Sequence, residues 1–213
     1  MSEMKITDKM LRKLADGREY RRMTMQVRAS ENDDEMIVDG YATTFNSPYT
    51  LFDGEHFRIV EKIAPTAFNE CDMSDVIFQY DHEGRVFARN RNNTLWLNTD
   101  NVGLLIKANL GGTDIGRQLY QEIKGGYTDR MSFGFIVGED ERLYTKDPER
   151  DLQICTRTIT KIKKLFDVSA VSMPANDMTS ISARNYADGV IAEFEAERLK
   201  AQKIKKLKLM MEV

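Results

Sequence analysis

Three residues of the sequence carry the side chains of a nucleophilic reaction: a serine, a histidine and an aspartate. Ser132 lies in MSFGF (131–135), where apolar residues alternate around it as they do in a β-strand. A serine hydroxyl is a weak nucleophile and needs a base that accepts its proton, and the base usually needs an acceptor that orients it. Ser132 is therefore a candidate nucleophile only if such partners lie near it. Without them, a strand serine is an ordinary polar residue.

Histidine is the usual base in such a set, and the sequence holds two histidines. His82 comes just after the apolar segment DVIFQY (75–80) and just before a glycine. We therefore expect it at a strand end, which is rigid on one side and open on the other. His56 lies in the polar segment FDGEHFR (52–58), where an exposed loop residue is expected. His82 is the candidate base.

Asp167 is the candidate acid, in the apolar segment KLFDVSAVSM (164–173). Aspartate is uncommon in strands, and an ionised carboxylate is costly to bury unless it is hydrogen-bonded. Two interpretations remain open: a carboxylate bonded for function, or one that faces water. In the first, Asp167 would accept a hydrogen bond from His82 and fix its tautomer. The three residues then form a nucleophilic set in the chain order His–Ser–Asp, which differs from the three familiar orders.

Gly134 follows Ser132 by two positions and shares its expected strand face. Glycine inside a strand often marks a bulge or the close approach of another backbone. We therefore expect Gly134 to leave room for a bound chain or for backbone donors.

The composition limits the class of protein. The 213 residues suit one domain with appendages, and 41% hydrophobic residues allow a sizeable core. A net charge of −3 gives no reason to expect nucleic acid as a partner. Cys71 and Cys155 have neither zinc-site spacing nor a disulfide framework, which suits a reducing compartment. The absence of a signal-peptide core or a long apolar run predicts a soluble intracellular protein with no membrane partner.

Short strands dominate the expected secondary structure, with two short interior helices at 64–72 and 113–126. We expect three segments: an N-terminal helical extension (1–23), a β domain (24–185) and a charged helical tail (186–213). The predicted fold class is α+β, mainly antiparallel β, with a barrel or sandwich core decorated by helices. The expected strands lie in 23–29, 35–45, 57–63, 75–80, 94–98, 103–110, 131–137, 152–162 and 164–173.

Several motifs together resemble a known family, over about residues 38–184. They are GYATTFN (40–46), EKIAPTAF (61–68), GRVFARNRNNTLWL (84–97), DNVGLLIKANL (100–110), GRQLYQEIKGGYTDRMSFGF (116–135) and DVSAVSMPANDMTSISAR (167–184). In this order and spacing they resemble the prohead proteases of tailed bacteriophages and prophages, capsid-maturation serine proteases related to herpesvirus assemblin.

The resemblance implies a herpesvirus-protease-like β-barrel and a proteolytic triad. The family's histidine matches His82 and its nucleophile matches Ser132. The third member is an acidic residue, often Glu, and the matching position here is Asp167. Assemblins use a second histidine instead, but His56 lies outside the motif, so Asp167 is kept.

The implied activity is a serine endopeptidase that cleaves capsid and scaffold segments, and itself, inside the assembling prohead in the bacterial host cytoplasm. His82 would deprotonate Ser132, and backbone N–H groups would stabilise the oxyanion. No metal or organic cofactor is implied. Self-association is expected by analogy with the assemblin dimer. The charged tail is expected to be a docking or self-cleaved segment.

Three other interpretations remain open. The first is a catalytically inactive capsid-assembly scaffold or binding module on the same fold. The second is a cysteine enzyme that uses Cys71 or Cys155, although buried or incidental thiols explain both better. The third is phosphate binding through the glycine pairs at 111–112 or 125–126, neither of which matches a phosphate-loop pattern.

Overall fold

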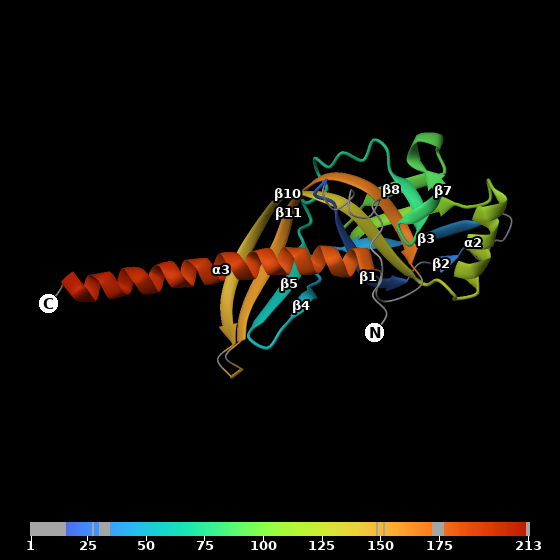
Figure 1. Ribbon diagram of the computed structural model, residues 1–213. Helices are drawn as coiled ribbons and strands as arrows, with labels where there is room; N and C mark the ends of the chain where they lie inside the picture. The colour runs from blue at the N-terminus through green and yellow to red at the C-terminus, as the bar shows by residue number, and fades with distance from the viewer. Residues whose placement is uncertain are drawn as a thin grey trace.

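The computed structural model describes residues 16–26, 28–29, 35–147, 149–150, 152–171 and 177–211. Two β-sheets form the body of the molecule, and a long C-terminal helix lies beside it (Figure 1). The part of the expected N-terminal helix that falls in residues 1–15 lies outside the described residues.

The larger sheet has seven strands, and its main path is β1-β10-β11-β5-β4. β6 pairs with both β11 and β7. The pairings are antiparallel except those of β11 with β5 and with β6, which are parallel. The strands are β1 (Glu19–Gln26), β4 (Tyr49–Asp53), β5 (Phe57–Ile63), β6 (Ile77–Tyr80), β7 (Glu83–Arg89), β10 (Arg130–Asp147) and β11 (Leu152–Val171).

The smaller sheet is antiparallel and follows the order β2-β3-β9-β8. The main core lies between the two sheets, because one buried cluster joins Val38 and Ile106 of the smaller sheet to Phe133 and Val168 of the larger. The strands are β2 (Arg28–Ala29), β3 (Ile37–Thr44), β8 (Leu95–Thr99) and β9 (Gly103–Asn109).

Three helical segments complete the described structure. The 3-10 helix η1 (Asn90–Asn92) follows β7. Helix α2 (Asp114–Lys124) begins after Thr113, whose side chain accepts a hydrogen bond from the Gly116 N–H as an N-cap, as its sequence predicts. Helix α3 covers Asp177–Met211.

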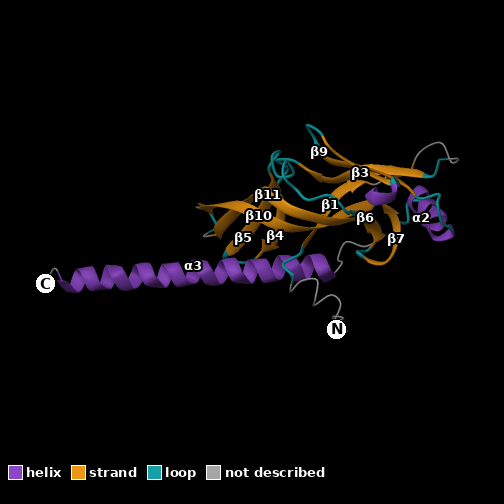
Figure 2. Cartoon of the chain, turned by 90° about the horizontal axis from the view of Figure 1, so that it is seen from above, coloured by secondary structure: helices purple, strands orange, loops and turns teal. Residues whose placement is uncertain are grey.

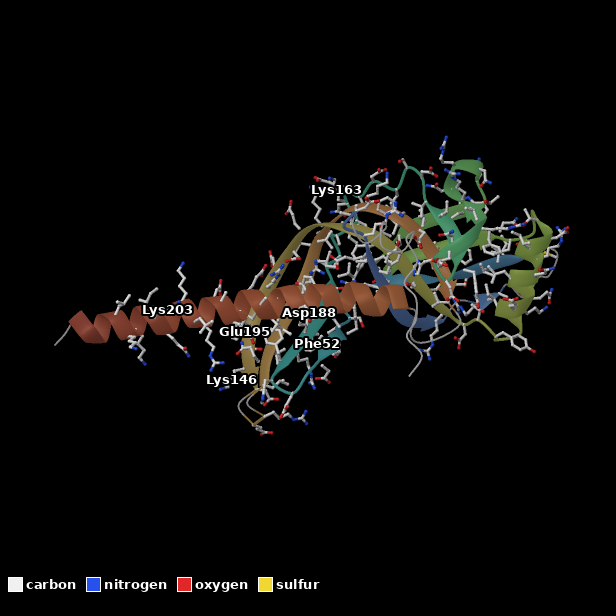
Figure 3. All side chains as sticks on the ribbon, viewed as in Figure 1. Phe52, Lys146, Lys163, Asp188, Glu195 and Lys203 are labelled. Carbon is white, nitrogen blue, oxygen red and sulfur yellow. The ribbon has the colours of Figure 1, made fainter. Side chains whose placement is uncertain are left out.

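Helix α3 lies against the larger sheet only along its first part. Ala187 and Val190 are buried in a second apolar cluster with Phe57 and Cys155. The helix then continues past the sheets, and Lys203 lies on this projecting part (Figures 2 and 3). Among the helices that the structure describes, none combines the length and apolar character needed to cross a membrane.

The fold class is confirmed as α+β with mainly antiparallel strands. Several local expectations were wrong. Residues 19–23, expected at the end of a helix, form strand β1 because they pair with β10. Residues 49–53, expected in a loop, form β4 against β5. Residues 64–72 form turns instead of a helix, and residues 138–147, expected in a loop, continue β10.

Candidate active site

Ser132 and Asp167 lie on one face of two neighbouring strands. β10 and β11 are antiparallel, with Ser132 opposite Ser169 and Gly134 opposite Asp167. Directly opposite residues share a face of the sheet, so these four positions point the same way. The register then shifts between Gly134 and Phe135, which places a bulge next to Asp167.

His82 reaches this face from a tight turn. β6 runs parallel to β11, and the turn from β6 to β7 has two central residues, Asp81 and His82. Both are left-handed, with φ of 48° and 59°, the conformation that a type I′ hairpin turn requires. The Asp81 N–H donates to the Ala170 carbonyl at 3.0 Å and fixes the turn to β11. A non-glycine residue in this conformation costs about 1 kcal/mol or more, and such strain is concentrated at functional sites.

The three side chains form one continuous hydrogen-bonded series. His82 Nδ1 contacts Asp167 Oδ1, and His82 Nε2 lies 2.5 Å from Ser132 Oγ. All three residues are buried. A proton can therefore pass from the hydroxyl to the imidazole while the carboxylate balances the charge that forms. The structure thus brings together the three residues singled out in the sequence.

His56 lies elsewhere, with an exposed side chain beside Glu55.

Ser169 is a member of the cluster that the sequence did not single out. Its hydroxyl donates to Asp167 Oδ1 at 3.1 Å, and its Oγ lies 3.2 Å from His82 Nδ1. It therefore contacts the same carboxylate oxygen as His82 and lies beside the imidazole. Its position two residues after Asp167 on the same strand face was the signal that could have identified it.

The space beside Gly134 is occupied. A Cβ atom there would lie 2.5 Å from Asp167 Oδ2 and 2.7 Å from Tyr20 Cε1. The glycine therefore makes room for the carboxylate and for the Tyr20 ring of β1, whereas we expected room for a bound chain or for backbone donors. Burial, and then the negative charge of Asp167, raise the pKa of Tyr20, which keeps its phenol neutral.

Strand β1 covers the serine. Ser132 is only 1% exposed, and its Oγ donates to the carbonyl oxygen of Arg21 at 2.9 Å. The hydroxyl has one proton, so it can be donated to Arg21 or to His82, but not fully to both. Arg21 and Tyr20 lie in a segment expected to be helical, which is why the sequence did not point to them.

A second buried polar cluster lies close by and is ionic. The Arg21 Nε and Nη2 atoms donate to the two oxygens of Glu61 at 2.6 and 3.0 Å. Arg157 donates to Glu61 and Glu19, and the Tyr49 hydroxyl also contacts Glu61. Burial alone would raise the pKa of Glu19, but the charges of Arg21 and Arg157 outweigh it and hold that pKa at about 2.

The cysteines do not resemble reactive thiols. Cys155 is fully buried in the apolar cluster beneath α3, and burial raises its pKa. Burial also raises the pKa of Cys71, to about 11. Thiolates are scarce at neutral pH in both cases, which counts against the cysteine enzyme. Within the residues that the structure describes, no three His, Cys, Asp or Glu side chains are grouped as metal ligands.

Comparison with known proteins identifies the family. The model of the caudovirus prohead serine protease family matches residues 23–190 of the 213. The chain belongs to this family. The match supports a capsid-maturation protease, a hydrolase of bacteriophage assembly. Neither the curated proteins nor the solved structures contain a significant match.

Proposed function

We propose that the protein is a serine endopeptidase that cleaves capsid and scaffold segments inside the phage prohead, with Ser132, His82 and Asp167 as its triad. The observation that carries the proposal is the 2.5 Å separation of His82 Nε2 and Ser132 Oγ, with Nδ1 held by Asp167. A hydroxyl, an imidazole and a carboxylate in this order suit acyl transfer. Membership of the prohead protease family supports capsid proteins as substrates.

The first half of the reaction forms an acyl-enzyme. Ser132 Oγ bonds to the carbonyl carbon of the scissile peptide while its proton moves to Nε2 of His82, and the carbonyl electron pair moves onto oxygen. Asp167 stabilises the imidazolium through Nδ1. The carbonyl then re-forms, the C–N bond breaks, and the Nε2 proton goes to the departing amine.

The second half regenerates the enzyme. Water gives a proton to Nε2 as its oxygen attacks the ester carbon, and the Ser132 Oγ–C bond then breaks. The proton returns from His82 to Ser132 Oγ, and the carboxylic acid product leaves. Atoms and charge balance without a cofactor.

The core shared by two sheets supports a herpesvirus-protease-like barrel arrangement for the β domain. The family supports action within assembling proheads, in the cytoplasm of the bacterial host, and self-association is proposed by analogy with assemblin. The projecting end of α3 is proposed as a docking or self-cleaved tail because it extends past the sheets (Figure 2).

The test is co-expression with the major capsid protein of the same genome. We expect wild type to remove a defined segment of the capsid protein and Ser132→Ala to lose about 10⁶-fold in rate, as nucleophile removal does in other serine proteases. Intact mass measures cleavage, and thermal unfolding checks that the variant folds. Ser74→Ala, which alters an exposed hydroxyl bonded to Asp72, is the matched control. If Ser132→Ala still cleaved the capsid protein, the assignment of Ser132 as the nucleophile would be refuted.

One observation favours a second candidate, an inactive scaffold on the same fold: Ser132 is almost fully buried. A serine-reactive phosphonate applied to assembled particles separates the two functions. Labelling of Ser132 supports the protease. Uncut capsid protein together with no labelling supports the scaffold.

A further inference from the structure

Strand β1 occupies the edge of β10 beside the candidate nucleophile. The two strands are antiparallel, with Arg22 opposite Ser132 and Glu19 opposite Phe135. β1 is also the last strand on this side of the sheet path. An extended peptide that pairs with β10 next to Ser132 would need the same edge, since strand addition uses the free backbone groups of an edge strand.

Successive residues of β1 meet successive parts of the candidate site. The carbonyl oxygen of Arg21 accepts the hydrogen bond from Ser132 Oγ at 2.9 Å. The ring of Tyr20 lies edge-on against His82, with 4.7 Å between the ring centroids. The peptide bond after Arg21 is therefore the one held at the nucleophile, and Tyr20 precedes it against the base.

The side chain of Arg21 fills a buried acidic pocket. Its guanidinium makes a two-point contact with Glu61, at 2.6 and 3.0 Å, and both residues are at most 1% exposed. Planar two-point pairing of this kind selects a guanidinium over a neutral side chain. The pocket next to the nucleophile is thus built for a positive charge.

When β1 leaves, Glu61 loses the two-point contact with Arg21 but keeps Arg157 as a partner. Arg157 remains paired with Glu61 and with Asp140, each at 2.8 Å. Of the charged residues in this pocket, β1 contributes Arg21 and Glu19, one charge of each sign. The family match begins at residue 23, so Arg21 precedes the matched region while the pocket lies within it.

We propose that β1 lies where the substrate strand binds, so that the site takes an extended peptide with a basic residue immediately before the scissile bond. The peptide runs antiparallel to β10, and the basic side chain reaches Glu61. This inference rests on the proposed protease function. It also requires β1 to leave β10 before a substrate enters.

The test maps the cut sites in assembled particles that contain the full-length protein and the capsid protein of the same genome. Mass spectrometry of the new termini is expected to show Arg or Lys immediately before each cut. Changing that substrate residue to Gln is expected to slow the cut at least about a hundredfold, because a neutral side chain cannot make the two-point charged contact with Glu61. The control changes the nearest basic residue that precedes no cut, and its rate should stay within twofold.

The possible results distinguish failure of the proposed basic preference from failure of the proposed protease function. Cuts after apolar or acidic residues, or a Gln substrate cut within tenfold of the original rate, overturn the basic preference and leave the protease intact. Uncut capsid protein in particles that contain the wild-type chain refutes the proposed function, and the inference with it. The substrate-side change needs no variant of the buried Glu61, so misfolding of the protease cannot produce either result.

Discussion

The two faces of strand β1 meet two buried polar clusters of different character. Tyr20 contacts the cluster of His82, Ser132 and Asp167, whereas the next residue, Arg21, joins the ionic cluster around Glu61. Successive residues of a strand point to opposite faces, so a single step along the chain separates the two environments.

The clusters differ in how their charges are balanced. In the ionic cluster, Arg21 and Arg157 face Glu61 and Glu19, so each charge has a partner of opposite sign. In the triad cluster, Asp167 faces the imidazole of His82 and the hydroxyl of Ser169. A balanced cluster stabilises one arrangement. A cluster that gains its balancing charge only when a proton moves can assist a reaction.

The largest expected effect after loss of the nucleophile comes from Asp167→Asn. The amide has no negative charge to hold the Nδ1 proton or to stabilise the imidazolium, so capsid cleavage should fall about 10⁴-fold. The variant should still fold, with a thermal unfolding temperature close to that of wild type. The rate of capsid cleavage measures the effect, and thermal unfolding monitors the fold.

Asp72→Asn is its control, because that exposed carboxylate pairs with Lys164 away from the site. A variant of Asp167 that kept a tenth of the wild-type rate would show that the two clusters do not differ in the way described.

Glu61→Gln should act on stability. It leaves Arg21 and Arg157 buried with one carboxylate fewer, which we expect to lower the free energy of unfolding by about 3–5 kcal/mol. Urea denaturation measures the change. Glu70→Gln removes an exposed ion pair with Lys161 and should have little effect. Equal effects from the two variants would mean that the buried cluster contributes no more than a surface pair.

Acid should weaken the ionic cluster through Glu19. Its pKa is about 2 in the folded protein against an ordinary 4.5, so its contribution is complete above about pH 4.5 and is lost as the pH falls towards 2. The shift corresponds to about 3 kcal/mol. Between pH 6 and pH 2, the free energy of unfolding should therefore fall more steeply with decreasing pH for wild type than for Glu19→Gln. If the free energies of unfolding of the two proteins fell in parallel as the pH was lowered, Glu19 would not be a source of the acid sensitivity.

The smallest effect is expected at Ser169, a positioning residue. Ser169→Ala removes one hydroxyl hydrogen bond to the Asp167 carboxylate, which should slow cleavage about five- to tenfold. Ser169→Thr keeps the hydroxyl and suits a strand, so it should restore most of the rate. If Thr and Ala behaved alike, the hydroxyl would have no positioning role.

The sequence predicted the parts of the site that depend on local chemistry. Ser132 and Asp167 were visible as polar residues inside apolar strands, and His82 as a histidine at a strand end. Their mutual contact was not visible, because it depends on the pairing of β10 with β11 and of β11 with β6. The role of Gly134 was missed for the same reason, since its neighbours Asp167 and Tyr20 come from two other strands.

The fold shows the same division. Strands with alternating apolar residues, such as β5 and β9, were found close to their observed bounds. Charged segments were not predicted as strands, because pairing with a neighbouring strand, and not local sequence preference, determines their structure. The end of β10 is largely exposed yet forms a ladder with β11 as far as Asp147, opposite Leu152. The start of β1 became a strand through its pairing with β10.

The turn that carries His82 has a consequence for how this chain can vary. The turn has only two central residues, and a backbone hydrogen bond fixes Asp81 to β11, so the turn cannot take up an extra residue without displacing His82. One inserted residue would lengthen the backbone by about 3.3–3.8 Å, which exceeds the tolerance of a hydrogen bond. Related chains can lengthen many of their surface loops, but the turn between β6 and β7 should keep its two-residue length in every relative that retains proteolysis.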